Sequence, residues 1–523
     1  MDFKNIQKIE NATNSSRKEL FRLGTALLFI IAVMLVVSTI HPINSTRDLL
    51  LIIAAMIGGY MALNIGANDV ANNVGPAVGS KAITLVGAII IAVIFESAGA
   101  LVAGGDVVST IKKGIIDPAL IPDSDTFIWL MMGALLAAAI WLNMATAVGA
   151  PVSTTHSIVG GVLGAGIAAG GFEIANWAQM GKIAASWVIS PLLGGLIAAA
   201  FLLFLKKTVL FKEDIISAGK KIVPFIISIM AWAFTTYLLL KGLKKIWQLD
   251  FLTAGGIGLI AAVCIFIIIR PLIIHASKHL ENSVESVNQL FTIPLIVAAA
   301  FLSFAHGAND VANAVGPLAA INDAIVHYDI AKKAAIPLWV MMVGAVGIAI
   351  GLSLYGPKLI KTVGSEITEL NKIRAFCVAM AASITVIIAS QLGLPVSSTH
   401  IAVGGVFGVG FLREYLKRDE LSIEAQIMEH HIDKDPEEVA EILKHFAKTN
   451  IEGKRYMLKE LKENSKKGAL TKTERKQLNK IYKCQLVKRS QLLRIIAAWV
   501  ITVPASALMA ALLFFMIRGM MLP

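Results

Sequence analysis

The chain has 523 residues, of which 56% are hydrophobic and only 16% are charged, and its mean hydropathy is +0.73. This composition excludes a soluble protein, which needs far more charge to cover its surface. The net charge of +12 lies mostly in polar stretches between apolar runs, as membrane topology requires, and does not indicate nucleic acid. The three cysteines are far apart and show no metal-ligand spacing or disulfide framework.

Apolar runs follow a polar tail at residues 1–20. Many approach the roughly 20 residues that cross a hydrocarbon core, and the first is too long for a signal-peptide core. Barrel strands would instead alternate apolar and polar residues over about 10 positions, so we expect spanning helices. The runs lie at about 21–40, 49–63, 82–104, 126–148, 183–205, 222–240, 252–274, 291–305, 336–355, 373–392 and 493–518.

Two polar motifs occur twice in these apolar surroundings. GANDVANNVGP at 66–76 returns as GANDVANAVGP at 307–317, 241 residues later, and PVSTTH at 151–156 returns as PVSSTH at 395–400, 244 residues later. The nearly equal offsets indicate that one half of the chain is a copy of the other. Polar groups are costly in a bilayer, so the motifs predict a functional site, and interrupted spans at matching positions are typical of secondary transporters.

The segments around 66–80, 151–172, 307–320 and 395–411 are rich in Gly, Ala, Asn and Ser. Non-helical backbone at membrane depth is tolerated only where protein buries it or water reaches it. We therefore expect broken helices or re-entrant hairpins around a cavity, in an all-α polytopic membrane protein.

The Asn-Asp pairs have the chemistry of an ion site. A half-helix that starts there presents free backbone N–H groups to an anion, and a carboxylate is a hard oxygen ligand for a small cation. The next amide lies on the same helical face as each pair. The candidate residues are Asn68, Asp69, Asn72, Asn309, Asp310 and Asn313.

Three successive hydroxyls begin each second motif after a proline. Ser and Thr cap helix N-termini, and with the backbone N–H groups behind them they form a neutral cradle for an oxyanion. A single such triplet is usually only a cap, but its duplication in apolar surroundings favours a functional reading. The residues are Ser153, Thr154, Thr155, Ser397, Ser398 and Thr399.

Other polar residues have two readings. His156 and His400 follow the hydroxyls and are either packed structural histidines or proton and substrate contacts. Glu96 lies inside an apolar run and is a candidate for a transport role, although the repeat offset lands near Pro337. His306 stands where the first motif has an isoleucine, so we expect it to be local rather than part of a symmetric site.

Enzyme signatures are absent from the sequence. There is no Gly-x-x-x-x-Gly-Lys-Ser/Thr phosphate loop, no His-Glu-x-x-His and no cysteine pair. We expect neither catalysis nor a cofactor, and ATP is not indicated as an energy source.

The duplicated pair of motifs resembles the inorganic phosphate transporter (PiT) family, the type III sodium–phosphate symporters and their bacterial relatives. The resemblance covers about 49–205 and 290–411 with the last span, and it leaves out 412–492. It implies two inverted repeats, with phosphate between the motifs and coupling to Na⁺ or H⁺. The six Asn and Asp residues would bind phosphate, Asp69, Asp310, Asn68 and Asn309 would also line cation sites, and Na⁺ would lie at the two aspartates. The residues alone indicate an oxyanion and a cation.

The halves pose a topological question. A tally of apolar runs between the two Asn-Asp motifs places the halves in the same direction, whereas the resemblance implies opposite directions. Hairpins make such a tally unreliable, so we expect one miscounted crossing.

Residues 412–492 are polar, dense in Lys and Glu, and carry helix-start signals such as DPEE at 435–438. We expect a small helical cytoplasmic insertion that is a solvated spacer, a regulatory or partner-docking module, or a membrane-surface helix. The expected divisions are a tail at 1–20, a first-repeat region at 21–205, linking spans at 206–289, a second repeat at 290–411, the insertion at 412–492 and a last span at 493–523.

We therefore expect a multi-pass protein of the cell membrane, plasma or inner, that imports inorganic phosphate by symport. The alternatives are a transporter of sulfate or another tetrahedral oxyanion, a channel, or a transport-dead sensor. Na⁺ and H⁺ both suit aspartate-rich sites. Membrane lipid, a second copy of the chain as a homodimer and a regulatory partner at 412–492 are further partners to test.

Overall fold

The computed structural model describes residues 3–147, 152–242, 247, 249–327, 336–366, 370–416, 441–443, 445, 456–457 and 489–521. Structural statements below concern these residues. Most of the insertion at 412–492 lies outside them, so its predicted helices and roles remain predictions.

Helices make up the described fold, which contains no strand and a single isolated bridge between Ile116 and Ala175. Short π-helical turns at Lys206–Leu210 and Leu238–Gly242 extend α8 and α9. The α-helices are α1 Phe3–Ile40, α2 Thr46–Asn68, α3 Ala71–Gly79, α4 Leu85–Ala103, α5 Gly105–Lys113, α6 Ser124–Ala147, α7 Thr154–Gly170, α8 Trp177–Leu205, α9 Ile215–Tyr237, α10 Phe251–Ala276, α11 Val284–Leu290, α12 Thr292–His327, α13 Leu338–Glu366, α14 Lys372–Gln391, α15 Ser398–Leu416 and α20 Arg489–Met521.

Among the described residues, 11 helical segments are long and apolar enough to cross a membrane. Each coincides with one of the predicted apolar runs, so the all-helical, multi-pass architecture is confirmed. The chief difference is length: the run predicted at 291–305 belongs to a segment that reaches Val326, because its polar motif continues the helix.

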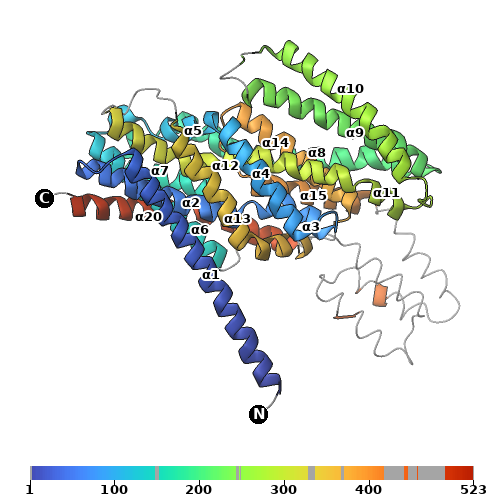
Figure 1. Cartoon of the computed structure of the whole chain (residues 1–523), viewed down its shortest axis with the longest axis horizontal. Helices are drawn as coiled ribbons and strands as arrows, with labels where there is room; N and C mark the ends of the chain where they lie inside the picture. Colours follow the sequence, from blue (N-terminus) through green and yellow to red (C-terminus); the bar gives the residue numbers. More distant parts are fainter. Residues whose placement is uncertain are drawn as a thin grey trace.

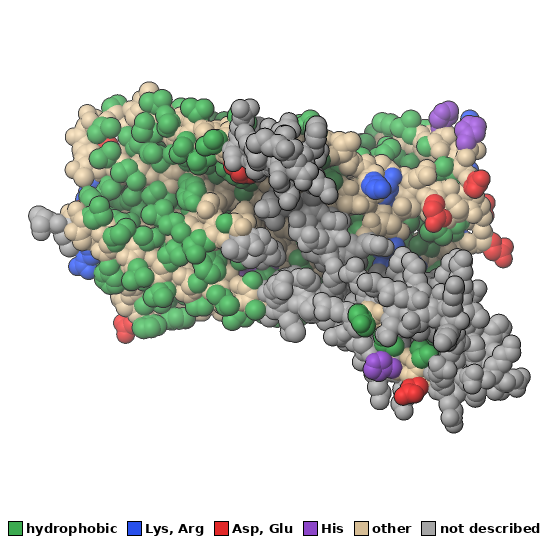
Figure 2. Space-filling view, turned by 90° about the horizontal axis from the view of Figure 1, so that it is seen from below, with side chains coloured by type: hydrophobic (Ala, Val, Ile, Leu, Met, Phe, Trp, Pro, Cys, Tyr) green, Lys and Arg blue, Asp and Glu red, His purple; other side chains and the backbone are tan. Residues whose placement is uncertain are grey.

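Burial sorts these helices into an inner and an outer group. Helix α12 crosses the middle of the bundle, and 83% of the residues in its most apolar stretch are buried. In the most apolar stretches of α1 and α10, only 17% of the residues are buried. Figure 1 shows α10 with α9 on the outside of the bundle and α1 running along another side. Outer side chains such as Leu259 and Ile267 are exposed, and hydrophobic side chains cover much of the body in Figure 2. This surface suits contact with lipid.

The two halves are interwoven at close helix crossings. A Cβ on Gly66 of α2 would lie 2.0 Å from the Ile348 carbonyl oxygen of α13, and one on Gly351 would lie 2.0 Å from that of Leu63. Only glycine permits such backbone contact. Each first-half helix at these crossings therefore packs on a second-half helix.

An equivalent crossing joins α4 to α12. A Cβ on Gly307 would lie 2.2 Å from the Glu96 carbonyl oxygen, and one on Gly99 would lie 2.0 Å from that of Phe304. Gly307 is the repeat of Gly66, and each of these glycines meets a carbonyl oxygen of a helix from the other half. The two crossings are therefore equivalent if Ile348, the partner of Gly66, corresponds to Glu96, the partner of Gly307. The structural counterpart of Glu96 is therefore Ile348, not a residue near Pro337, because the spacing between the repeat elements differs along the chain.

The two motif helices run in opposite directions. Gly58 of α2 packs on Leu318 of α12, whereas Asp69 lies close to Asp310, so numbering rises along one helix as it falls along the other. Equivalent helices thus have the orientation that inverted repeats require.

The packing of α6 and α7 explains why the count of apolar runs between the two Asn-Asp motifs predicted the same direction for both halves. Helix α6 reaches Asn68 at Thr146, and α7 leaves from Thr154 beside Asp69, while Gly161 packs back on Ala134. Helices α6 and α7 are therefore antiparallel, and the end of α6 and the start of α7 both lie beside the first Asn-Asp motif. Such a pair adds no net crossing, which accounts for the difference in direction.

One predicted break is absent. The chain turns at residues 69–70 between α2 and α3, but α12 runs without interruption through 307–320. At the first break the Asn72 side chain donates 3.1 Å to the Asp69 backbone carbonyl. In the second motif Ala314, a stronger helix former, stands in place of Asn73, and the helix continues.

Candidate functional site

Asp69 lies in the turn between α2 and α3 and is 2% exposed. Thr154, the first residue of α7, donates 2.6 Å from its hydroxyl to Oδ2. The Thr399 hydroxyl lies 3.5 Å from Oδ1. A residue from each hydroxyl triplet therefore contacts this one carboxylate.

Asp310 is the counterpart on the unbroken helix α12 and is 1% exposed. The Ser398 hydroxyl, at the start of α15, donates 3.2 Å to Oδ2. Because α12 continues through this position, no free helix N-terminus exists here, and that part of the sequence prediction is wrong. A helix does begin at the first motif, where α3 starts at Ala71. The two hydroxyl motifs begin α7 and α15.

The predicted caps are confirmed at both of those starts. Ser153 accepts 3.1 Å from the backbone N–H of His156, and Ser397 accepts 3.3 Å from that of His400. Two helices thus begin beside the two aspartates, so their positive dipole ends converge on one buried region. An anion bound there would be stabilised by both helices.

Amides from each half reach across to the hydroxyls of the other. Asn72 donates 2.8 Å to the Thr399 hydroxyl. Asn313 donates 3.0 Å to that of Thr154 and 3.2 Å to that of Thr155. Six of the predicted residues, taken from both halves, therefore form one hydrogen-bonded network: Asp69, Asn72, Thr154, Thr155, Asn313 and Thr399.

The leading amides are held by two residues that sequence reasoning missed. Asn68 donates 2.8 Å to the Thr146 hydroxyl, and the Asn309 amide lies 3.0 Å from the Ser390 hydroxyl. Thr146 and Ser390 are themselves separated by the repeat offset of the hydroxyl motifs. That offset was the signal that could have found them.

Asp69, Asp310 and His306 form a compact buried group. Their potential ligand atoms all lie within 4.8 Å of one another. Two carboxylates that close together repel when both are charged, and the repulsion is stronger away from water. A bound cation would relieve it, so the group fits a small cation whose ligands are chiefly carboxylate oxygens.

His306 belongs to this site, contrary to the sequence expectation that it is local. Its Nε2 lies 2.8 Å from Asp310 Oδ2, one helical turn away, and its Nδ1 lies 2.7 Å from Glu96 Oε2. Glu96 also accepts 2.7 Å from the Asn73 amide. The structure therefore connects Glu96 to the acidic group through His306.

His156 and His400 lie next to each other, and neither ring has a hydrogen bond to either motif aspartate. Their rings lie 4.5 Å apart, and each packs on a tryptophan: Trp187 at 3.9 Å from His156 and Trp499 at 3.6 Å from His400. Their ring nitrogens are buried and have no hydrogen-bond partner among the described residues. The contacts are those of packed structural histidines.

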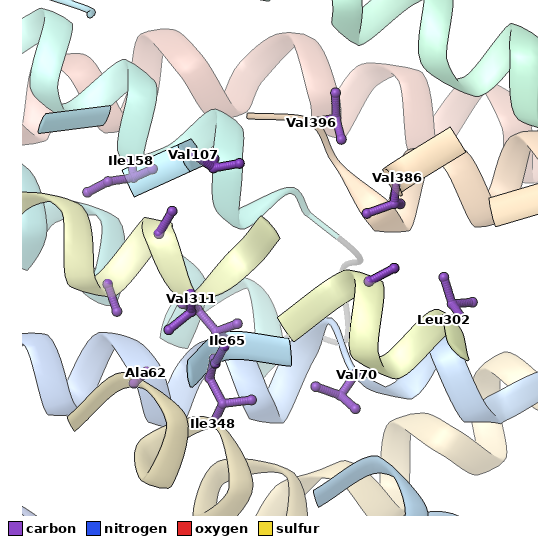
Figure 3. Close-up of a cluster of buried hydrophobic side chains, with 14 of the residues drawn as sticks. Ala62, Ile65, Val70, Val107, Ile158, Leu302, Val311, Ile348, Val386 and Val396 are labelled. Carbon is purple, nitrogen blue, oxygen red and sulfur yellow. The ribbon is translucent and has the colours of Figure 1, made fainter. Parts of the chain in front are cut away.

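Apolar side chains surround the polar group. Figure 3 shows Ile65 beside Val311 and Ile348, which come from α2, α12 and α13, and all three are at most 1% exposed. Ile65 and Val311 are close neighbours of the motif aspartates in sequence. Such walls keep the local dielectric low and strengthen electrostatic interactions inside.

The profile of the phosphate transporter family matches residues 65–510 of this chain, which takes in both copies of each motif. The chain belongs to the phosphate transporter family. Membership in this family identifies the protein as a multi-pass membrane transporter and not an enzyme, in agreement with the motifs and the 11 candidate spans.

Relatives in the family extend over most of the chain. A "Putative phosphate permease" of Helicobacter pylori is 53% identical over 524 residues, which is 98% of each chain. A protein of the same description from Pyrococcus furiosus is 41% identical over 366 residues, 70% of this chain and 88% of the relative. A solved structure described as "The sodium-dependent phosphate transporter" is 30% identical, with a TM-score of 0.73 over 90% of this chain and 100% of that one.

Proposed function

We propose that this protein is a secondary active symporter that imports inorganic phosphate together with Na⁺. The observation that carries the proposal is the buried cluster in which both aspartates, both hydroxyl triplets and both helix starts meet. Each half contributes equivalent groups to it, as expected where a transported solute binds between repeats.

Phosphate would bind between the starts of α7 and α15. Its donors would be the hydroxyls of the two triplets, Ser153, Thr154, Thr155, Ser397, Ser398 and Thr399, with the amides of Asn72 and Asn313 beside them. The convergent helix dipoles supply positive potential without a fixed cation. A protonated phosphate can also donate a hydrogen bond to a nearby carboxylate, which sulfate cannot, so the aspartates favour phosphate.

Na⁺ would bind at Asp69 and Asp310 with the amide oxygens of Asn68 and Asn309. An anion next to two buried carboxylates is strongly unfavourable unless cations enter with it. This requirement couples the two solutes. Na⁺ is supported over H⁺ by the oxygen ligands and by the structural neighbour, which is described as sodium-dependent.

Transport would proceed by alternating access. Cation binding neutralises the aspartates, phosphate enters, and the loaded cluster closes before the repeats rearrange to open the other side. The starts of α7 and α15 carry the hydroxyls, while the turn between α2 and α3 and helix α12 carry the aspartates. Relative movement of these elements would make and break the site.

The direct test is uptake of radiolabelled phosphate into proteoliposomes under an inward Na⁺ gradient, and separately under an inward H⁺ gradient. A large excess of unlabelled sulfate is added in a parallel set. We expect the Na⁺ gradient to drive uptake and sulfate to leave it unchanged. Uptake driven only by H⁺ would overturn the coupling ion, and transport of sulfate in place of phosphate would overturn the substrate.

A further inference from the structure

One line of side chains in the cluster has no polar counterpart in the other half. At the crossing of α4 and α12 stand Glu96 and His306, with Asn73 beside them. At the equivalent crossing of α2 and α13 the same positions hold Ile348 and Ile65, and Ala314 takes the place of Asn73. Three polar residues on one side thus correspond to three apolar ones on the other.

The polar line is continuous and ends on one aspartate. The Asn73 amide donates 2.7 Å to Glu96 Oε1, Glu96 Oε2 lies 2.7 Å from His306 Nδ1, and His306 Nε2 lies 2.8 Å from Asp310 Oδ2. Each of these side chains is at most 1% exposed. Bulk solvent therefore does not reach these contacts, and the side chains in the line are the polar neighbours of one another.

The two aspartates consequently have different supports. Among the described side chains, those that hydrogen-bond to the Asp69 carboxylate are the hydroxyls of Thr154 and Thr399. Asp310 has the Ser398 hydroxyl and an imidazole ring, both at Oδ2. The orientation of a buried imidazole is determined by its packing and by the partners of both ring nitrogens, and the partner of Nδ1 here is Glu96.

We propose that Glu96 is a positioning residue that orients His306 against Asp310 and so makes the two cation positions unequal. The inference rests on the proposed function, because it assigns different roles within the same cation site. Glu96 itself touches neither aspartate. It acts as outer partners of ion ligands do, by fixing the orientation of the group that contacts the ligand.

The consequence lies in cation affinity rather than in phosphate affinity. Loss of an outer partner typically costs about tenfold or more in ion affinity. We expect Glu96→Gln, which keeps the shape but cannot accept from both Asn73 and His306, to raise the half-saturating Na⁺ concentration by about tenfold. The phosphate KM at saturating Na⁺ is expected to stay within about twofold of the wild-type value.

The experiment measures initial phosphate uptake into proteoliposomes against Na⁺ concentration at fixed pH, and against phosphate at saturating Na⁺. The variants are Glu96→Gln, His306→Asn and the double variant, with Ile348→Val as the matched control at the equivalent position. A purely structural role would lower the amount of active protein without moving the half-saturating Na⁺ concentration. The double variant should resemble the single ones, because both changes break the same line.

Two results would overturn the inference. A Na⁺-dependent wild type whose half-saturating concentration is unchanged in Glu96→Gln, or in His306→Asn if the first variant does not fold, contradicts this inference alone. A wild type with no Na⁺-dependent uptake contradicts the proposed function and this inference with it.

Discussion

At the scale of single residues, the site depends on polar groups that are buried away from water and hydrogen-bond to one another instead. Asp69 is 2% exposed and Asp310 1%, and both accept hydrogen bonds from hydroxyls at the starts of α7 and α15. Duplication of the motifs in the sequence was sufficient to predict these residues. It was insufficient for His306 and Glu96, because a pair that exists in one half only leaves no repeat signal.

Asp69→Asn is the first prediction at this scale. The substitution keeps the size of the side chain and removes the charge that a cation would neutralise, so Na⁺-driven phosphate uptake should fall to the background of empty liposomes. Asp117→Asn is the matched control, since Asp117 is an exposed cap of a short 3₁₀ helix that accepts 3.0 Å from the Ala119 N–H. Normal uptake by Asp69→Asn, with equal protein in the membrane, would contradict the assigned role.

At the scale of helices, backbone contact between halves determines the arrangement of the site. Such crossings require glycine at fixed positions, but the sequence shows many glycines and does not indicate which of them meet a partner helix. The positions of the spans were predictable from apolar runs alone, but their full lengths were not. The continuity of α12 was not, because the motif sequence is almost the same as the one that breaks between α2 and α3.

Gly351→Ala tests the crossing of α13 with α2. Its Cβ would lie 2.0 Å from the Leu63 carbonyl oxygen, so the helices must separate, at a cost of about 1–3 kcal/mol or more. We expect a lower thermal unfolding temperature in detergent and reduced uptake. Gly256→Ala on α10, where no atom lies within 4 Å, is the control and should change neither quantity. Equal behaviour of the two variants would contradict the close crossing.

The ion pair of Lys112 on α5 with Asp323 on α12 gives a second test at this scale. Both side chains are buried, at 7% and 5% exposed. Lys112→Ala leaves a buried carboxylate without its partner and should destabilise the protein by about 3–5 kcal/mol. Replacing both by alanine should restore part of the loss. Thermal unfolding of the single and double variants measures the loss of stability in each. A double variant less stable than the single one would show that the two charges do not stabilise each other.

At the scale of the whole molecule, two inverted and interwoven halves bring their motifs together at one buried place. The sequence predicted this architecture through the duplicated motifs and the apolar runs. It did not predict the direction of the halves, because an apolar run looks the same whether it crosses the membrane or forms one arm of a hairpin such as α6–α7. Direction became clear only from contacts, as between Gly58 and Leu318.

The central claim is that a cation gradient moves phosphate against its own gradient through this site. The most direct measurement is the steady-state ratio of internal to external phosphate in proteoliposomes under an inward Na⁺ gradient, before and after a Na⁺ ionophore is added. We expect a ratio of internal to external phosphate well above one, which returns to one when the Na⁺ gradient is dissipated. A ratio that stays at one while phosphate equilibrates would show a channel and contradict the claim.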